Sequence, residues 1–146
     1  MKKLLLLIPI LLISTITMAD SVMKIPSNHG TAETMDRFEK IVKSKGLTVF
    51  TRINHRAAAK KVGMDMNDAE VILFGNPKMG TAIMKFDAAA GLELPLRVLV
   101  YNDNEGKTWI SYHNPQSLKD NYDVAKSPAL AKAEGALAKL TAKAAE

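Results

Sequence analysis

The sequence contains no cysteine, so neither disulfide bonds nor thiol chemistry contributes to this protein. A domain without disulfides in an oxidising compartment must be stabilised by its hydrophobic core alone. The same absence excludes a cysteine nucleophile and the Cys/His spacings typical of structural zinc sites. The chain also has no Gly-x-Ser-x-Gly segment, which excludes the nucleophile elbow of serine hydrolases.

The chain has no strong excess of charge of one sign. Its formal net charge is +5 at pH 7, and the lysines and arginines are spread along the sequence. Such a mild and dispersed excess favours solubility and lacks the basic cluster typical of nucleic-acid binding. We therefore expect no nucleic-acid partner.

Only one long apolar run is present, and it lies at the N-terminus. Two lysines precede the run Leu4–Ile16, and small residues ending at Ala19 follow it. This order is typical of a secretory signal peptide, and the run is too short for a membrane span. We predict cleavage after Ala19, a periplasmic or secreted location and no stable membrane insertion after cleavage. The alternative is an uncleaved anchor.

Hydrophobic periodicity then predicts alternating strands and helices. Strands are expected at 21–25, 47–54, 71–74, 96–101 and 107–112, and helices at 31–45, 55–62, 77–87 and 128–143.

The turn residues at 102–106 predict that the last two strands form an antiparallel hairpin. Strand 96–101 is apolar on both faces, so we expect it at the sheet centre, covered on both sides. The thin apolar stripe of the last helix predicts loose docking or fraying.

These elements predict a single compact α+β domain: a mixed sheet of about five strands with helices packed on it. The chain divides into a signal peptide at 1–19, this domain at 20–126 and an Ala/Lys-rich helix at 127–146.

Four segments together resemble a known family. They read INHRAAAKKVG at 53–63, FGNPKMGT at 74–81, LELPLRVLVYND at 92–103 and WISYHNP at 109–115. The chain is similar, over about residues 23–122, to the bacterial and archaeal family called domain of unknown function 302. The resemblance implies a compact α+β fold that is often dimeric, and it implies no particular reaction. The Ala-rich tail and the methionines at 64 and 66 are not explained by it.

The Asn-Pro pair at 76–77 predicts a junction between a strand and a helix. Proline disfavours helical backbone in the residue before it, which suits Asn76 as an N-cap, and Pro77 at the first helical position loses no hydrogen bond. A second interpretation is a ligand site, because a helix start with free N–H groups, Lys78 and Thr81 attracts anions. The glycine spacing does not match a phosphate loop, and a second Asn-Pro pair at 114–115 favours an architectural role.

The three histidines do not share the spacing of a metal site. His55 is predicted at the first position of a helix, where the positive helix end favours the neutral imidazole. A neutral imidazole ligates metals and accepts protons, although scattered histidines more often only form hydrogen bonds. His55 is the best functional candidate among them, because it also lies in a segment that carries the resemblance.

Two further features allow other functions. The thioethers of Met64 and Met66 suit Cu(I), but two methionines without a nearby His or Cys supply too few ligands and more often fill gaps in a core. Glu93 is a candidate buried carboxylate. Arg97 either pairs with Glu93 or binds an anionic ligand.

We expect an exported, non-enzymatic module that binds a small ligand or a partner protein. The sequence identifies no catalytic residue and no metal site. The sequence identifies no cofactor. Because polar residues converge there on strand ends and helix starts around an apolar core, the candidate ligand site combines His55, Asn76, Lys78, Thr81 and Arg97.

Two alternative functions and the oligomeric state stay open. One alternative is a periplasmic copper-binding protein that uses His55, Met64 and Met66. The other is a small enzyme in which His55 and Glu93 form an acid–base pair. The expected oligomeric state is a homodimer.

Overall fold

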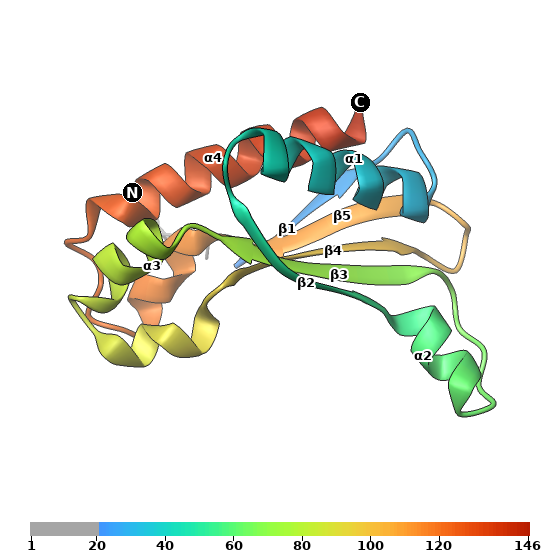
Figure 1. Ribbon diagram of the computed structural model, residues 1–146, viewed down its shortest axis with the longest axis horizontal. Helices are drawn as coiled ribbons and strands as arrows, with labels where there is room; N and C mark the ends of the chain where they lie inside the picture. Colours follow the sequence, from blue (N-terminus) through green and yellow to red (C-terminus); the bar gives the residue numbers. More distant parts are fainter. Residues whose placement is uncertain (1–20) are drawn as a thin grey trace, which may run out of the picture.

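Five strands form one open sheet, and two long helices cover one of its faces (Figure 1). The computed structural model describes residues 21–146, so the predicted signal peptide lies outside the described residues. The elements are β1 (Val22–Pro26), α1 (Thr31–Ser44), β2 (Thr48–Asn54), α2 (His55–Lys61), β3 (Ala69–Gly75), α3 (Pro77–Met84), the 3₁₀ helix η1 (Ala88–Glu93), β4 (Leu96–Asn102), β5 (Thr108–His113), the 3₁₀ helix η2 (Pro115–Asp120) and α4 (Pro128–Ala145). Within this range no helix combines the length and the apolarity needed to cross a membrane.

The sheet is entirely antiparallel in the described chain, which corrects the prediction of a mixed sheet. Its order is β1-β5-β4-β3-β2, and each neighbouring pair is antiparallel. The strand–helix alternation misled the prediction, because it is typical of parallel βαβ units. Here α2 and α3 lie within connections between antiparallel neighbours, and α1 joins β1 at one edge to β2 at the other.

The hydrophobic core lies between the sheet and the helices α1 and α4. Phe38 of α1 and Phe74 of β3 are almost completely buried and meet edge to face, with ring centroids 5.2 Å apart. Val98 and Val100 of β4 complete the sheet side of this core. The expectation that β4 is central is confirmed, but its second face is not covered by helices, and Arg97 on that face is exposed.

Helix α4 is a firmly packed part of the core, so the expected loose docking is wrong. Leu137 is 1% exposed and Ala144 is fully buried. The Nε of Arg37 on α1 also donates a hydrogen bond of 3.2 Å to the carbonyl oxygen of Ala144. The alanines that make the apolar stripe look thin are small enough for close approach between α4 and α1. At its start, Leu130 joins a second apolar cluster with Ile83.

Candidate functional site

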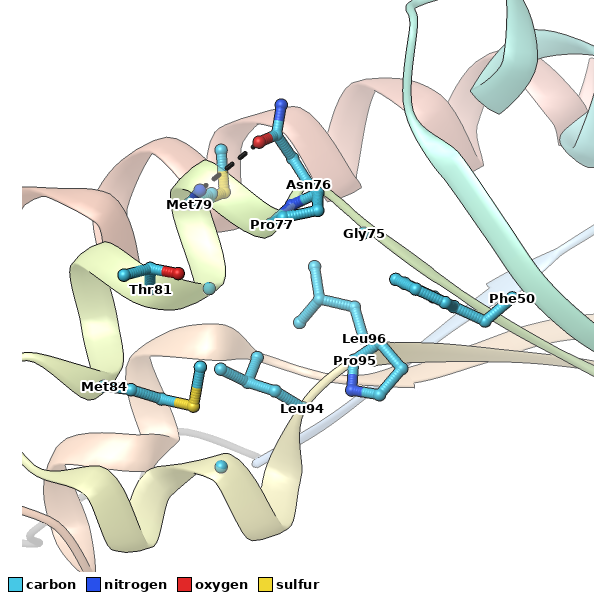
Figure 2. Close-up of a pocket in the computed structure, with 12 residues that line it drawn as sticks. Phe50, Gly75, Asn76, Pro77, Met79, Thr81, Met84, Leu94, Pro95 and Leu96 are labelled. Atoms are coloured by element: carbon cyan, nitrogen blue, oxygen red, sulfur yellow. Dashed lines mark hydrogen bonds between the residues drawn. The ribbon is translucent and has the colours of Figure 1, made fainter.

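A pocket of about 380 Å³ opens between α3, η1 and the adjoining ends of β2, β3 and β4 (Figure 2). Its lining is predominantly apolar. The lining residues are Phe50, Gly75, Asn76, Pro77, Met79, Gly80, Thr81, Met84, Gly91, Leu94, Pro95 and Leu96. The volume lies in the usual range for pockets that hold small organic molecules.

A β-bulge in β2 directs Phe50 to the pocket. Val49 pairs with Phe74 and Thr51 pairs with Leu73, so Phe50 is the extra residue of the bulge. Its ring lies against Gly75, where a Cβ would be 3.8 Å from Phe50 Cε2. Phe50 is 55% exposed despite its size, and it forms one side of the pocket (Figure 2).

Helix α3 contributes one face to the pocket. Pro77, Gly80, Thr81 and Met84 are spaced as residues i, i+3, i+4 and i+7, so they lie on one side of the helix. Gly80 keeps that side shallow, because a Cβ there would be in ordinary contact with Leu94 Cδ1 at 3.8 Å.

The lower wall of the pocket comes from η1 and the start of β4. A Cβ at Gly91 would lie only 3.0 Å from Met84 Sδ, so glycine allows the methionine to rest against the η1 backbone. Leu94, Pro95 and Leu96 then continue the apolar wall toward Phe50 (Figure 2).

The N-terminus of α3 is capped by its own side chain. Asn76 Oδ1 accepts hydrogen bonds from the N–H of Lys78 at 2.9 Å and the N–H of Met79 at 3.4 Å. The N–H of Gly80 donates to the Asn76 carbonyl oxygen at 2.9 Å, and Pro77 has no N–H. The predicted cap is therefore confirmed. Every N–H of this first turn already has an acceptor, and none is available to an anion.

The five predicted ligand residues do not come together as one site. Asn76 and Thr81 line the pocket, and Lys78 lies on the same first turn of α3 with an exposed side chain. Arg97 is on β4, where its Nη2 donates a hydrogen bond of 3.1 Å to Glu93 Oε2. The structural alternative for Arg97, an ion pair, is therefore the arrangement that forms.

The structure places His55 away from the pocket. β2 runs from Thr48, which pairs with Gly75 at the pocket, to Asn54, which pairs with Glu70. Seven residues of extended strand span about 20 Å. His55 follows at the far end as the first residue of α2, and it cannot contact a ligand in this pocket.

Glu93 takes part in a small polar cluster beside the pocket. Besides the ion pair with Arg97, it accepts a hydrogen bond of 3.2 Å from the Tyr122 hydroxyl. Desolvation and the adjacent Glu93 charge raise the pKa of Tyr122, so the phenol stays protonated and remains a donor. Because His55 lies at the opposite end of β2, the structure does not bring together the predicted acid–base pair of His55 and Glu93.

The methionines of the copper alternative lie beyond α2. Met64 is 66% exposed and Met66 is 40% exposed, so they do not fill gaps in the core. Within residues 21–146, no group of three or more His, Cys, Asp or Glu side chains is placed to hold a metal ion.

Most of the apolar lining was missed by the sequence reasoning. Phe50 lies within the strand predicted at 47–54, and Leu94 and Pro95 lie outside every predicted helix and strand. The available signal is three glycines, at 75, 80 and 91, each of which has a side chain from another segment within 4 Å of its Cβ position. Only the fold shows that these three segments meet.

Comparisons with known proteins agree with this fold. The family model of the domain of unknown function DUF302 matches residues 23–145, which includes the Ala/Lys-rich helix that had been set apart as a tail. A crystal structure of an uncharacterised conserved DUF302 protein from Bacillus stearothermophilus superposes with a TM-score of 0.76 and 24% identity, covering 86% of this chain and 99% of that chain.

Curated relatives include two proteins named fluoride-specific ion channel FluC 1, from Brucella suis biovar 1 and Brucella abortus biovar 1. Each is 39% identical over 100 residues, which is 68% of this chain. The chain spans only 39% and 37% of the length of these relatives, respectively.

Proposed function

This chain belongs to the DUF302 family, and we propose that it is a non-enzymatic module that binds small, mainly apolar molecules in the pocket beside α3. The observation that carries the proposal is the composition of the pocket wall. Nearly all of its lining is apolar, and the first-turn N–H groups of α3 that could hold an inorganic anion are engaged in the Asn76 cap. An apolar molecule gains free energy there by leaving water, at roughly 25 cal/mol per Å² of buried surface.

The proposal is tested by filling the pocket from within. Gly80→Leu places an apolar side chain into the space beside Leu94, whereas Gly135→Leu changes a helical glycine of α4 that has no heavy atom within 4 Å of its Cβ position. The probe is 1-octanol, titrated into labelled protein while backbone amide resonances are recorded. We expect shifts concentrated at the pocket residues in the wild type and in Gly135→Leu, and at least tenfold weaker binding in Gly80→Leu. Equal binding by both variants would refute the pocket as the site.

Two accompanying proposals concern location and assembly. The charged, apolar and small residues in the order seen at 1–19 support export to the periplasm or beyond. The uncovered sheet face exposes Val22 by 47% on one edge strand and Ile53 by 42% on the other, and a homodimer that covers this face would bury both. Light scattering after size exclusion at micromolar concentration tests the dimer, which a monomer mass would exclude.

The names of the curated relatives suggest fluoride binding as a second candidate. The pocket argues against it, because a small anion requires N–H donors or cations inside the site, and the first-turn N–H groups of α3 are occupied. A fluoride titration followed by the same amide resonances separates the two candidates. Fluoride-induced shifts at α3 would favour this candidate over the apolar ligand.

The copper alternative has its own test. Elemental analysis and native mass spectrometry of the protein isolated from its own compartment detect a stoichiometric metal or a retained organic ligand. A stoichiometric metal that is lost in a variant lacking the sulfur of Met64 would support the copper alternative.

A further inference from the structure

Thr81 in the pocket lining and Lys78 on the first turn of the same helix have polar groups that the protein does not use. Thr81 lines the pocket, and its hydroxyl oxygen lies on the pocket side of α3 (Figure 2). No residue in the described part of the chain forms a hydrogen bond with that hydroxyl or an ion pair with the ammonium of Lys78. Lys78 precedes Thr81 by three residues, so the two side chains leave the helix on neighbouring positions of one side.

The acidic residue closest in sequence to the pocket wall is compensated. Glu93 directly precedes the lining residue Leu94, and its carboxylate is bound by Arg97 Nη2 at 3.1 Å and by the Tyr122 hydroxyl at 3.2 Å. An incoming anion therefore meets a neutralised pair at this wall and an uncompensated cation at Lys78.

We propose that the ligand is a linear amphiphile with a carboxylate headgroup, such as a medium-chain fatty acid. This inference rests on the proposed function, and it adds the chemical class of the ligand. The alkyl chain occupies the apolar space between Met84, Leu94 and Phe50. The carboxylate lies at the pocket edge, where it accepts a hydrogen bond from Thr81 and pairs with Lys78.

The position of the headgroup follows from the geometry of α3. The helix N–H groups are engaged by Asn76, so the headgroup is held by side chains. The cationic side chain is exposed and the lining is apolar, so the charge stays in water while the chain is buried. This division avoids the large free-energy cost of burying a charged group.

The experiment compares octanoate with 1-octanol at pH 7 by isothermal titration and amide shifts. We expect octanoate to bind the wild type about fivefold more tightly than 1-octanol, an effect of the size typical for one exposed charge-assisted contact. Affinity in the alkanoate series should rise about fourfold for each added methylene until the pocket is filled. Raising the salt concentration should weaken octanoate but not 1-octanol.

The decisive variants remove one lysine beside the pocket and one far from it. Lys78→Gln should weaken octanoate about fivefold and leave 1-octanol unchanged. Lys60→Gln removes an exposed lysine of α2, at the far end of β2 from the pocket, and should change neither. Thr81→Val should weaken both probes, because each headgroup accepts a hydrogen bond from the hydroxyl.

The outcomes distinguish this inference from the proposed function. If 1-octanol binds in the pocket but octanoate is no tighter, or Lys78→Gln has no selective effect, the carboxylate assignment is overturned while the apolar pocket stands. If neither probe binds the wild type, or Gly80→Leu binds both as well as the wild type, the proposed function fails with it.

Discussion

The stability of this domain should depend on one arginine that connects α1 to the sheet. On β2, Arg52 donates from Nε to Glu70 Oε2 at 2.6 Å and from Nη1 to Asp36 Oδ1 at 2.5 Å and Glu39 Oε2 at 3.2 Å. Desolvation lowers the pKa of Arg52, but the hydrogen bonds with these three carboxylates outweigh it and raise the pKa overall. The guanidinium therefore stays charged at any accessible pH.

The three carboxylates differ in their surroundings. The Glu70 side chain is 8% exposed, whereas that of Asp36 is 68% exposed. Pairs at the surface contribute about 0–1 kcal/mol, but removing one partner of a buried pair costs about 3–5 kcal/mol. Because 26% of the Arg52 side chain is exposed, we take the lower end and expect Arg52→Met to lower the free energy of unfolding by about 3 kcal/mol.

A double-mutant cycle identifies which carboxylate is responsible. In a Glu70→Gln background no charge is left buried, so Arg52→Met should cost only about 1 kcal/mol, the usual value of a hydrogen bond. In an Asp36→Asn background, Arg52→Met should still lower the free energy of unfolding by nearly as much as in the wild type. Urea unfolding followed by far-UV circular dichroism measures each variant, with equal m-values as the condition for comparison.

The reasoning is refuted if Arg52→Met has the same effect with and without the Glu70 carboxylate. That result would show that the packing of the arginine stem, and not the unpaired charge, determines the cost. A loss that disappears in the Asp36→Asn background would instead assign the stabilisation to the exposed pair.

Four other expectations follow from substitutions at single positions. Gly135→Ala should raise the free energy of unfolding by about 1 kcal/mol because helix α4 has room for a Cβ there, whereas Gly106→Ala, at a φ of +80°, should lower it by about 1 kcal/mol. In urea unfolding, a loss of stability in Gly135→Ala or a gain in Gly106→Ala would contradict the expectation for that position. Asn76→Ala should lower stability by about 1 kcal/mol through loss of the α3 cap, and an unchanged midpoint would show that the cap is dispensable. The hydrogen bond from the Trp109 indole, at 2.7 Å, is the main cause that lowers the pKa of Asp103 from its ordinary value, so this carboxylate stays ionised and bonded to a lower pH than a free aspartate does. The acid change in tryptophan fluorescence should therefore occur at a lower pH than the titration of a free aspartate, and Asp103→Asn should abolish that transition while the protein stays folded.

The helix starts were predictable because their signals are local. Asn54, Asn76 and Asn114 each accept a hydrogen bond from a backbone N–H two or three residues later, as residues of this type do when they cap a helix. Proline follows two of them and fixes the first helical φ. Such signals act within one turn of chain and do not require knowledge of the rest of the fold.

The antiparallel sheet and the packing of α4 were not predictable in the same way. Strand direction depends on which strands pair, and β1 pairs with β5 from the other end of the domain. The alanines of α4 indicate a weak apolar stripe by themselves. They become core residues because α1 and the sheet lie close enough to contact short side chains.

The sequence by itself determined the α+β class, the family resemblance and the capped start of α3, since each depends on residues close together in the chain. The tertiary structure alone decided that this start is one wall of an apolar pocket. Phe50, Gly91 and Leu94 reach the pocket through a bulge, a 3₁₀ helix and the pairing of β3 with β4. It also separated His55 from Asn76, because an extended strand carries its two ends far apart.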